Sequence, residues 1–226
     1  MICVSIAAST AATALAGAKE VEAKADVIEI RLDSQKDPEV RTFIGQLDRP
    51  LLFTNRPIWE GGGFVGAEEK RVELLLQAVQ ENAAYVDIEL KTEGNLRDMV
   101  LTTARSTSTQ VILSWHNFEE TPGADILRQM VIDQQRAGAH IGKIVTMARN
   151  YLDVLRILDL QTLAARHQFP LIAFCMGKAG AISRLATLRL GGYMTYAAPD
   201  AGISTAPGQF PISELRSLLS RIPNES

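Results

Sequence analysis

Cysteine and histidine are scarce in this chain of 226 residues, which contains two cysteines and three histidines. Cys3 and Cys175 lie in separate apolar segments and make no CxxC motif, so we expect reduced thiols in a cytoplasmic protein rather than a disulfide framework. His116, His140 and His167 fall on different predicted elements, and the sequence has no HxxxH, HxH or DxD pair. The sequence therefore predicts no metal site.

The chain also lacks an excess of positive charge and a long apolar run. Its formal net charge is −3 and it has no basic block, so nucleic acid is not an expected partner. No stretch is long and apolar enough to predict a membrane-spanning helix. The first 18 residues have no charged side chain, but they lack the basic start of a signal peptide, and Ser and Thr interrupt the apolar run. We expect a strand there, followed by a helix that begins at Ser9 or Thr10.

Short apolar segments alternate with segments of helical periodicity along the whole chain. Within Glu68–Glu81, apolar residues such as Val72 and Leu76 recur at offsets of three and four, as on one face of a helix. The predicted strands are Ile2–Ile6, Asp26–Ile30, Leu51–Thr54, Tyr85–Glu89, Gln110–Trp115, Lys143–Met147, Leu171–Phe174 and Met194–Ala197. The predicted helices are Thr10–Lys24, Pro38–Gln46, Glu68–Glu81, Leu96–Ser106, Gly123–Ala137, Tyr151–His167, Ile182–Leu190 and Ile212–Arg221.

This alternation predicts one domain, residues 1–226, with the fold of a (β/α)₈ TIM barrel. Near-continuous apolar strands separated by helices are typical of a parallel sheet that is covered on both faces. No change of composition marks a linker, and eight β–α repeats suit a closed barrel. An open, doubly wound sheet is the alternative, although no GxGxxG motif follows the first strand.

Polar residues follow the predicted strands at the end where such a barrel carries its active site. They are Glu29, Arg31, Arg56, Glu89, His116, Arg184 and Gln209. Acids, a base and arginines at one rim indicate a site for a polar small molecule, because the guanidinium fork suits a substrate carboxylate.

Lys143 is the one charged residue in GAHIGKIVTMA, residues 138–148. Lysine is rarely buried without a partner or a shifted pKa. At the start of its predicted strand, Lys143 could lie at the lower rim and extend to water. It could also lie inside the barrel as a neutral amine that attacks a carbonyl carbon. The strand pattern leaves both interpretations open.

The other candidates also have ordinary explanations. His116 could be a general acid and base or simply a polar residue of the rim. Arg31 could pair with a nearby aspartate, Arg56 with Glu60, and Arg184 could be an exposed helical residue. The glycine-rich GGGFVG and MGKAGAISR lack the P-loop spacing, so GGGFVG is more readily a mobile loop than a phosphate cradle.

Seven motifs of the sequence resemble those of the type I 3-dehydroquinate dehydratases in order and spacing. They are IEIRLD, FTNRPIWEGG, YVDIEL, ILSWHNFEETP, GKIVTMA, FCMGKAGAISR and STAPGQFPISELR. The resemblance covers nearly the whole chain, and each motif falls on a different β–α unit. It implies a (β/α)₈ barrel without metal or organic cofactor that converts 3-dehydroquinate to 3-dehydroshikimate in the shikimate pathway.

The resemblance also implies the roles of single residues. Lys143 matches the lysine that forms a Schiff base, His116 the general acid and base in a syn elimination of water, and Glu60 a carboxylate that supports His116. The matches to substrate contacts are Ser5, Glu29, Arg31, Arg56, Arg184, Thr205 and Gln209. The sequence departs from the family pattern at Asn117, where Asp is common, and at Thr205, where Ser is common.

Two alternative functions are considered beside this family, and the oligomeric state and the surroundings of the site are also predicted. Another Schiff-base barrel, such as a class I aldolase, would share the lysine, and a non-catalytic barrel scaffold is the second alternative. Members of the family are often homodimers, so a homodimer is predicted. Ile144, Val145 and Met147 are predicted to keep water away from Lys143. The glycine-rich segments GGGFVG and DAGISTAPGQ are predicted to be mobile lids.

Overall fold

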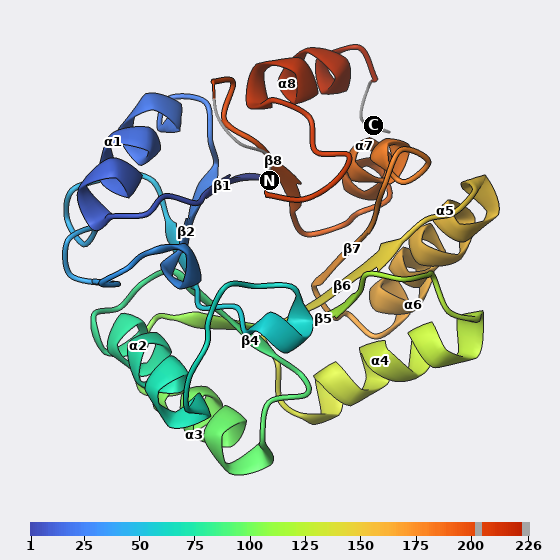
Figure 1. Cartoon of the computed structure of the whole chain (residues 1–226). Coiled ribbons are helices and arrows are strands. Elements are labelled where there is room, and N and C mark those ends of the chain that lie inside the picture. The colour runs from blue at the N-terminus through green and yellow to red at the C-terminus, as the bar shows by residue number, and fades with distance from the viewer. Residues whose placement is uncertain (202–204, 223–226) are drawn as a thin grey trace.

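The computed structural model describes residues 1–201 and 205–222. Eight parallel strands form one sheet in the order β7-β6-β5-β4-β3-β2-β1-β8, which curls into a nearly closed barrel (Figure 1). The strands are β1 Ile2–Ile6, β2 Val27–Arg31, β3 Leu51–Thr54, β4 Tyr85–Glu89, β5 Gln110–Asn117, β6 Ile141–Met147, β7 Leu171–Met176 and β8 Thr195–Ala197. The predicted single-domain (β/α)₈ fold is confirmed.

The helices form a ring around the strands (Figure 1). They are α1 Ala11–Val21, α2 Glu68–Gln80, α3 Gly94–Ala104, α4 Ala124–Arg136, α5 Tyr151–Leu158, α6 Leu160–Arg166, α7 Ala181–Arg189 and α8 Ile212–Ser220, with short 3₁₀ helices η1 Leu32–Ser34 and η2 Ile58–Glu60. Where one helix was predicted over Tyr151–His167, the structure has α5 and α6, separated by Asp159. No helix within the described ranges is long and apolar enough to cross a membrane.

The predicted helix Pro38–Gln46 is wrong. The segment makes successive turns, in which the Phe43 amide donates to the Val40 carbonyl at 3.1 Å and the Gln46 amide to the Phe43 carbonyl at 3.2 Å. Val40 and Phe43 are fully buried in the core. Their spacing of three therefore comes from two side chains that fix this loop to the core, and not from the face of a helix.

The interior of the barrel is layered because alternate side chains of each strand point inward. The lower layer is mainly apolar: Cys3, Val27, Leu52, Tyr85, Ile112, Ile141, Ile172 and Met194. Two residues further along the same strands lie Ser5, Glu29, Thr54, Asp87, Ser114, Lys143, Phe174 and Tyr196. Most of this second layer is polar or charged, yet all eight side chains are buried.

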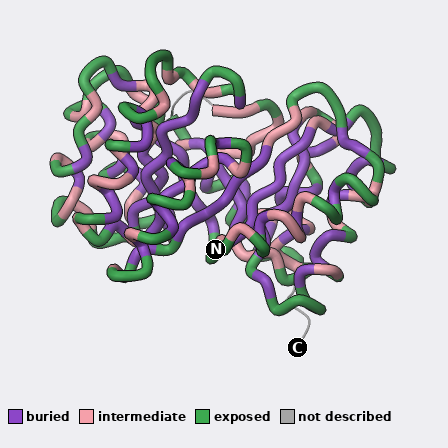
Figure 2. The backbone as a smooth tube through the Cα atoms, turned by 90° about the horizontal axis from the view of Figure 1, so that it is seen from below, coloured by how far each residue is buried: buried purple, intermediate pink, exposed green. Residues whose placement is uncertain are grey.

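The remaining strand residues point outward and pack under the helices. Ile28 and Ile30 of β2 belong to the largest apolar cluster, together with Ala14 and Ala18 of α1. Figure 2 shows this arrangement as buried tube along the strands and exposed tube along the outer helices and loops. The strands are thus fixed on both faces, which gives the second interior layer a rigid support.

Candidate active site

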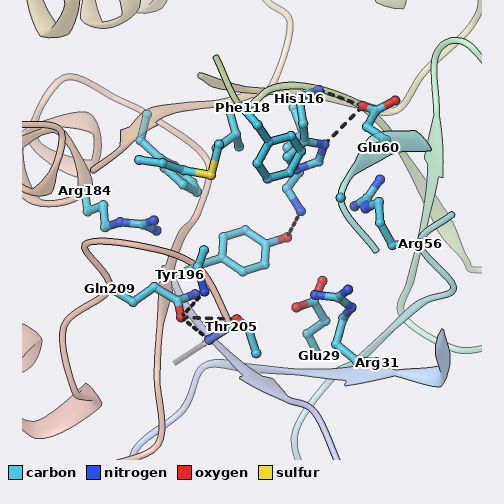
Figure 3. A pocket seen from close by; sticks show the side chains of 16 residues that line it. Glu29, Arg31, Arg56, Glu60, His116, Phe118, Arg184, Tyr196, Thr205 and Gln209 are labelled. Carbon is cyan, nitrogen blue, oxygen red and sulfur yellow. Dashed lines mark hydrogen bonds and ion pairs between the residues drawn. The ribbon is translucent and has the colours of Figure 1, made fainter. Parts of the chain in front are cut away.

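A pocket lies above the second interior layer, at the carboxyl ends of the strands (Figure 3). Its lining residues are Glu29, Arg31, Arg56, Glu60, Gly61, His116, Phe118, Lys143, Val145, Phe174, Met176, Arg184, Tyr196, Thr205, Ala206 and Gln209. The pocket therefore brings together nine of the ten residues proposed from the sequence. Ser5 is the exception.

Lys143 lies at the floor of this pocket. Because β6 begins at Ile141, Lys143 is the third residue of the strand and not its first, so the interpretation of a lower-rim lysine is wrong. Its side chain is buried, and its Nζ lies 2.9 Å from Asp87 Oδ2 and 3.1 Å from the Tyr196 hydroxyl. The question that the sequence left open is thus answered by geometry: the lysine points inward and is paired with a carboxylate.

Asp87 is the charge partner that the sequence interpretation missed. Its Oδ1 lies 2.8 Å from Arg56 Nη2 and accepts a hydrogen bond of 2.6 Å from the Ser114 hydroxyl. Burial alone would raise the pKa of Asp87, but the charges of Arg56 and Lys143 outweigh it and hold this pKa well below its ordinary value. A permanent carboxylate therefore lies beside the lysine nitrogen.

Arg56 is held by β4 rather than by its own loop. Its Nη1 lies 2.6 Å from Glu89 Oε1, and Arg71 Nη1 lies 2.6 Å from the other oxygen of Glu89. The pairing of Arg56 with Glu60, which the sequence allowed, does not occur. Two carboxylates thus hold Arg56 in the pocket wall.

His116 and Glu60 form a second pair of interacting residues in the pocket. Glu60 Oε1 accepts the main-chain N–H of His116 at 2.6 Å and lies 3.1 Å from the ring Nδ1 (Figure 3). Because this oxygen already acts as an acceptor, we assign the ring proton to Nδ1, which leaves a lone pair on Nε2. Phe118 stacks on the imidazole, with ring centroids 5.9 Å apart and planes 16° apart.

Burial shifts both members of this pair toward their neutral forms. Burial, reinforced by the charges of Arg56 and Lys143, lowers the pKa of His116 well below its ordinary value. Burial raises the pKa of Glu60 to about 8, against the opposing charge of Arg56. The imidazole is therefore a free base at neutral pH, as a proton acceptor requires.

Arg184 has hydrogen-bond donors that no other described residue uses. The residue is fully buried in α7, its guanidinium lies 4.5 Å from the centre of the Phe174 ring, and its Nη2 donates to the Pro207 carbonyl at 3.3 Å. Its Nε and Nη1 have no hydrogen-bond partner among the described residues. Burial lowers the pKa of Arg184 to about 10, so the group stays charged at neutral pH. Arg184 lies at the side of the pocket (Figure 3), as a cation without a carboxylate partner among the described residues.

Glu29 and Arg31 line the pocket from β2. Glu29 accepts hydrogen bonds from Ser5 and, at 2.8 Å, from Thr54. Ser5 therefore lies behind Glu29 and does not line the pocket. Arg31 makes two hydrogen bonds to Asp33, of 2.8 and 2.6 Å, so it does pair with a nearby aspartate. Its side chain nevertheless lines the pocket.

Thr205 and Gln209 close the pocket from the loop after β8. Gln209 Oε1 accepts from the Thr205 amide at 2.9 Å and from the Thr205 hydroxyl at 3.1 Å (Figure 3). Part of the segment predicted as a lid, residues 202–204, lies outside the described residues. Val145 lines the pocket, whereas Ile144 packs outward under the helices, so only part of the predicted apolar shield lies at the site.

Asp87, Phe118 and Tyr196 contact Lys143 or His116 but were absent from the sequence prediction. Asp87 had a signal, because it precedes Glu89 by two residues in YVDIEL and so shares its strand face. Tyr196 and Phe118 had none, because an aromatic residue in or after an apolar strand is usually part of the core.

The fold and the pocket define a (β/α)₈ barrel enzyme that acts on a small polar molecule. The sequence matches the family model for type I 3-dehydroquinase over residues 2–225. It is 45% identical to the 3-dehydroquinate dehydratase of Desulfotalea psychrophila over 222 residues, which cover 98% of each chain.

Solved structures agree with this match. The type I 3-dehydroquinate dehydratase of Clostridium difficile, with covalently modified comenic acid, superposes with a TM-score of 0.89 at 29% identity, over 98% of this chain and 91% of that one. The enzyme of Geobacillus kaustophilus gives 0.88 at 30% identity, over 98% and 90%. The chain therefore belongs to the type I 3-dehydroquinase family and is a hydro-lyase of the shikimate pathway.

Proposed function

We propose that the protein dehydrates 3-dehydroquinate to 3-dehydroshikimate through an imine on Lys143, with His116 as the base. The observation that carries this proposal is the placement of both groups in one pocket, on neighbouring strands, together with Arg184, whose Nε and Nη1 have no hydrogen-bond partner among the described residues. None of the proposed steps uses a metal ion or an organic cofactor.

The first step is condensation of Lys143 with the substrate ketone. The ammonium loses a proton, its nitrogen forms a bond to the carbonyl carbon, and the carbonyl π electrons move to oxygen. This oxygen takes up two protons in all and leaves as water, so that ammonium and ketone become iminium and water. The positive iminium then draws electrons from the neighbouring C–H bond and makes its proton acidic.

The second step is the elimination. His116 Nε2 takes the proton from the carbon next to the iminium, and the electron pair of that C–H bond forms an enamine. The enamine expels the hydroxyl group from the next carbon, and the imidazolium returns its proton to that hydroxyl, which departs as water. One base on one face of the ring serves both transfers, so the elimination is syn. Hydrolysis of the imine restores Lys143 and releases the product.

Substrate contacts follow from the charges of the pocket. Arg184 has two donor atoms without a partner among the described residues and suits the substrate carboxylate. The residues proposed to contact the ring hydroxyls are Glu29, Arg31, Arg56, Thr205 and Gln209. Ser5 acts through its hydrogen bond to Glu29. The homodimer stays a prediction.

Borohydride trapping tests the imine. Reduction in the presence of 3-dehydroquinate is expected to add the reduced, dehydrated substrate to Lys143, which mass spectrometry of the digested protein locates. Lys143→Ala is expected to lose both the adduct and turnover. Lys178→Ala, which removes an exposed lysine near the rim, is the matched control and is expected to keep both. An unmodified Lys143 in an enzyme that turns over normally would contradict the proposed mechanism.

Replacing His116 separates the two steps. In His116→Ala the imine still forms but loses its proton slowly, so the trapped fraction is expected to rise while turnover falls about a hundredfold or more. Product is followed by the ultraviolet absorbance of the conjugated enone. Carbon–carbon cleavage without this absorbance would instead identify an aldolase.

A further inference from the structure

Tyr196 is the least expected neighbour of Lys143. It comes from β8, the shortest strand, and its side chain is buried in the second interior layer. The lysine nitrogen lies 3.1 Å from the Tyr196 hydroxyl and 4.2 Å from the centre of its ring. Figure 3 shows the ring of Tyr196 in the middle of the pocket, between the wall of His116 and the loop of Gln209.

The two hydrogen bonds of Lys143 determine where its lone pair points. The nitrogen is tetrahedral, and as an ammonium it has three N–H bonds. One is directed at Asp87 Oδ2 and one at the oxygen of Tyr196, so the third is left for the pocket. When that third proton leaves, the lone pair takes its place and points at the substrate.

The Tyr196 oxygen can keep this acceptor role at neutral pH. Burial, with acidic groups nearby, raises the pKa of Tyr196 well above its ordinary value, so the hydroxyl stays protonated. Its own O–H bond has no acceptor among the described residues, because the Lys143 nitrogen is the one hydrogen-bond partner of this hydroxyl there. That O–H is available to a reactant oxygen.

We infer that Tyr196 is a positioning residue for imine formation: its oxygen and Asp87 together orient the Lys143 nitrogen toward the substrate carbonyl. Asp87 alone fixes one N–H direction and leaves the amine free to rotate about it. The second acceptor removes this freedom. The inference rests on the proposed function, because it concerns the attack by Lys143.

Tyr196→Phe tests the role of the oxygen, since phenylalanine keeps the ring beside Lys143 and removes only the hydroxyl. We expect kcat to fall about ten- to a hundredfold, the loss that a misaligned reacting group causes. The rate of adduct formation, measured by rapid mixing and borohydride quenching, is expected to fall by the same factor. KM is expected to stay within about twofold, because the proposed contacts to the substrate carboxylate and ring hydroxyls are unchanged.

Tyr193→Phe is the matched control. Tyr193 also has a hydrogen-bonded hydroxyl, 3.0 Å from that of Tyr85, but Tyr85 belongs to the lower interior layer on the far side of Lys143. This variant is expected to keep the wild-type kcat and adduct rate. Thermal unfolding of both variants detects any general loss of structure.

The outcomes separate this inference from the proposed function. If the wild type forms the Lys143 adduct and Tyr196→Phe forms it at the same rate, the positioning role is wrong and the mechanism stands. A fall in kcat with an unchanged adduct rate also overturns the inference, because Tyr196 would then act after the imine. If the wild type forms no adduct, the proposed mechanism fails and the inference fails with it. The two variants are expected to differ in opposite directions: Tyr196→Phe forms the adduct more slowly, whereas in His116→Ala the trapped fraction rises.

Discussion

The carboxyl group of Glu60 is unusual because it is buried and only half satisfied. Its Oε1 bonds to His116, while its Oε2 has no hydrogen-bond partner among the described residues. Burial raises its pKa to about 8 from an ordinary value of 4.5. The folded protein therefore holds a proton on Glu60 over a range of pH in which the unfolded chain has lost it.

This difference predicts how Glu60→Gln changes stability with pH. Between about pH 4.5 and 8 the folded state binds more protons than the unfolded state. The stabilisation that comes from this bound proton is therefore fully present below pH 4.5 and is lost as the pH rises to 8. Glutamine does not titrate. The unfolding free energy of the variant relative to wild type is therefore expected to increase from pH 5 to pH 8, by on the order of 1–4 kcal/mol.

Urea unfolding of both proteins at pH 5, 6.5 and 8 measures this change. Only the difference between the two proteins is compared, so that other titrating groups cancel. A difference that stays constant over this range would show that Glu60 is ionised in the folded protein.

At the residue scale, the sequence indicated the candidate reactive residues better than it indicated the side chains that hold them in place. The strand pattern leaves the roles of Lys143 and His116 open, the family resemblance assigns them, and both residues line the pocket. The partners of Lys143, Asp87 and Tyr196, are 56 and 53 residues away in sequence. Such pairs depend on how the barrel closes, which a periodic pattern does not contain.

At the scale of single elements, the short helix η2 carries Glu60, and the residue after it lies against the ring that stacks on His116. The helix ends at Glu60 and is followed by Gly61, whose φ of 75° favours glycine. A Cβ atom on Gly61 would lie 2.2 Å from Cζ of Phe118, the ring that stacks on His116. The absence of a side chain at Gly61 therefore makes room for Phe118.

Gly61→Ala is expected to push the Phe118 ring off His116. We expect a loss of stability of about 1–2 kcal/mol from the positive φ, together with a severalfold loss of kcat/KM. Gly45→Ala is the matched control, because Gly45 has a φ of 72° but no atom within 4 Å of the added Cβ. It should lose similar stability and keep its activity. Equal activities of the two variants, measured beside chemical unfolding, would contradict a role for the stack.

The strands were predicted closely, but one helix was not. Each predicted strand overlaps its counterpart, because near-continuous apolar residues are required wherever both faces are covered. Val40, Phe43 and Ile44 imitate a helical face over residues 38–46. Phe43 instead packs edge-on against Phe53 of β3, with ring centroids 6.0 Å apart. Packing against β3 determines the conformation of this segment, and the spacing of its apolar residues does not predict that packing.

At the scale of the whole molecule, the barrel has a seam between β7 and β8. No ladder joins these two strands in the part of the chain that the structure describes. The links there are single hydrogen bonds, from the Tyr193 amide to Leu171 at 2.9 Å and from the Gly177 amide to Pro207 at 3.3 Å. Arg184, which also bonds to Pro207, lies beside this seam.

A ligand that contacts Arg184, Gln209 and Lys143 together is therefore expected to stabilise the barrel across its seam. The borohydride-reduced adduct should unfold at least about 3 °C above the free protein, since 1 kcal/mol corresponds to roughly 2–4 °C at this chain length. Differential scanning calorimetry measures the shift. Lys143→Ala treated in the same way is expected to show none, and an unchanged unfolding temperature for the adduct would show that the seam is already rigid.

The alternation of side chains along the strands restricts how such a chain can gain or lose residues over evolutionary time. Deleting one residue of β6 before Lys143 would turn the amine toward the helices and direct Ile144 into the pocket. The turns below the barrel, which direct no side chain at the pocket, carry no such restriction. Insertions and deletions are thus confined to the connections, and the strands around the site keep a fixed length.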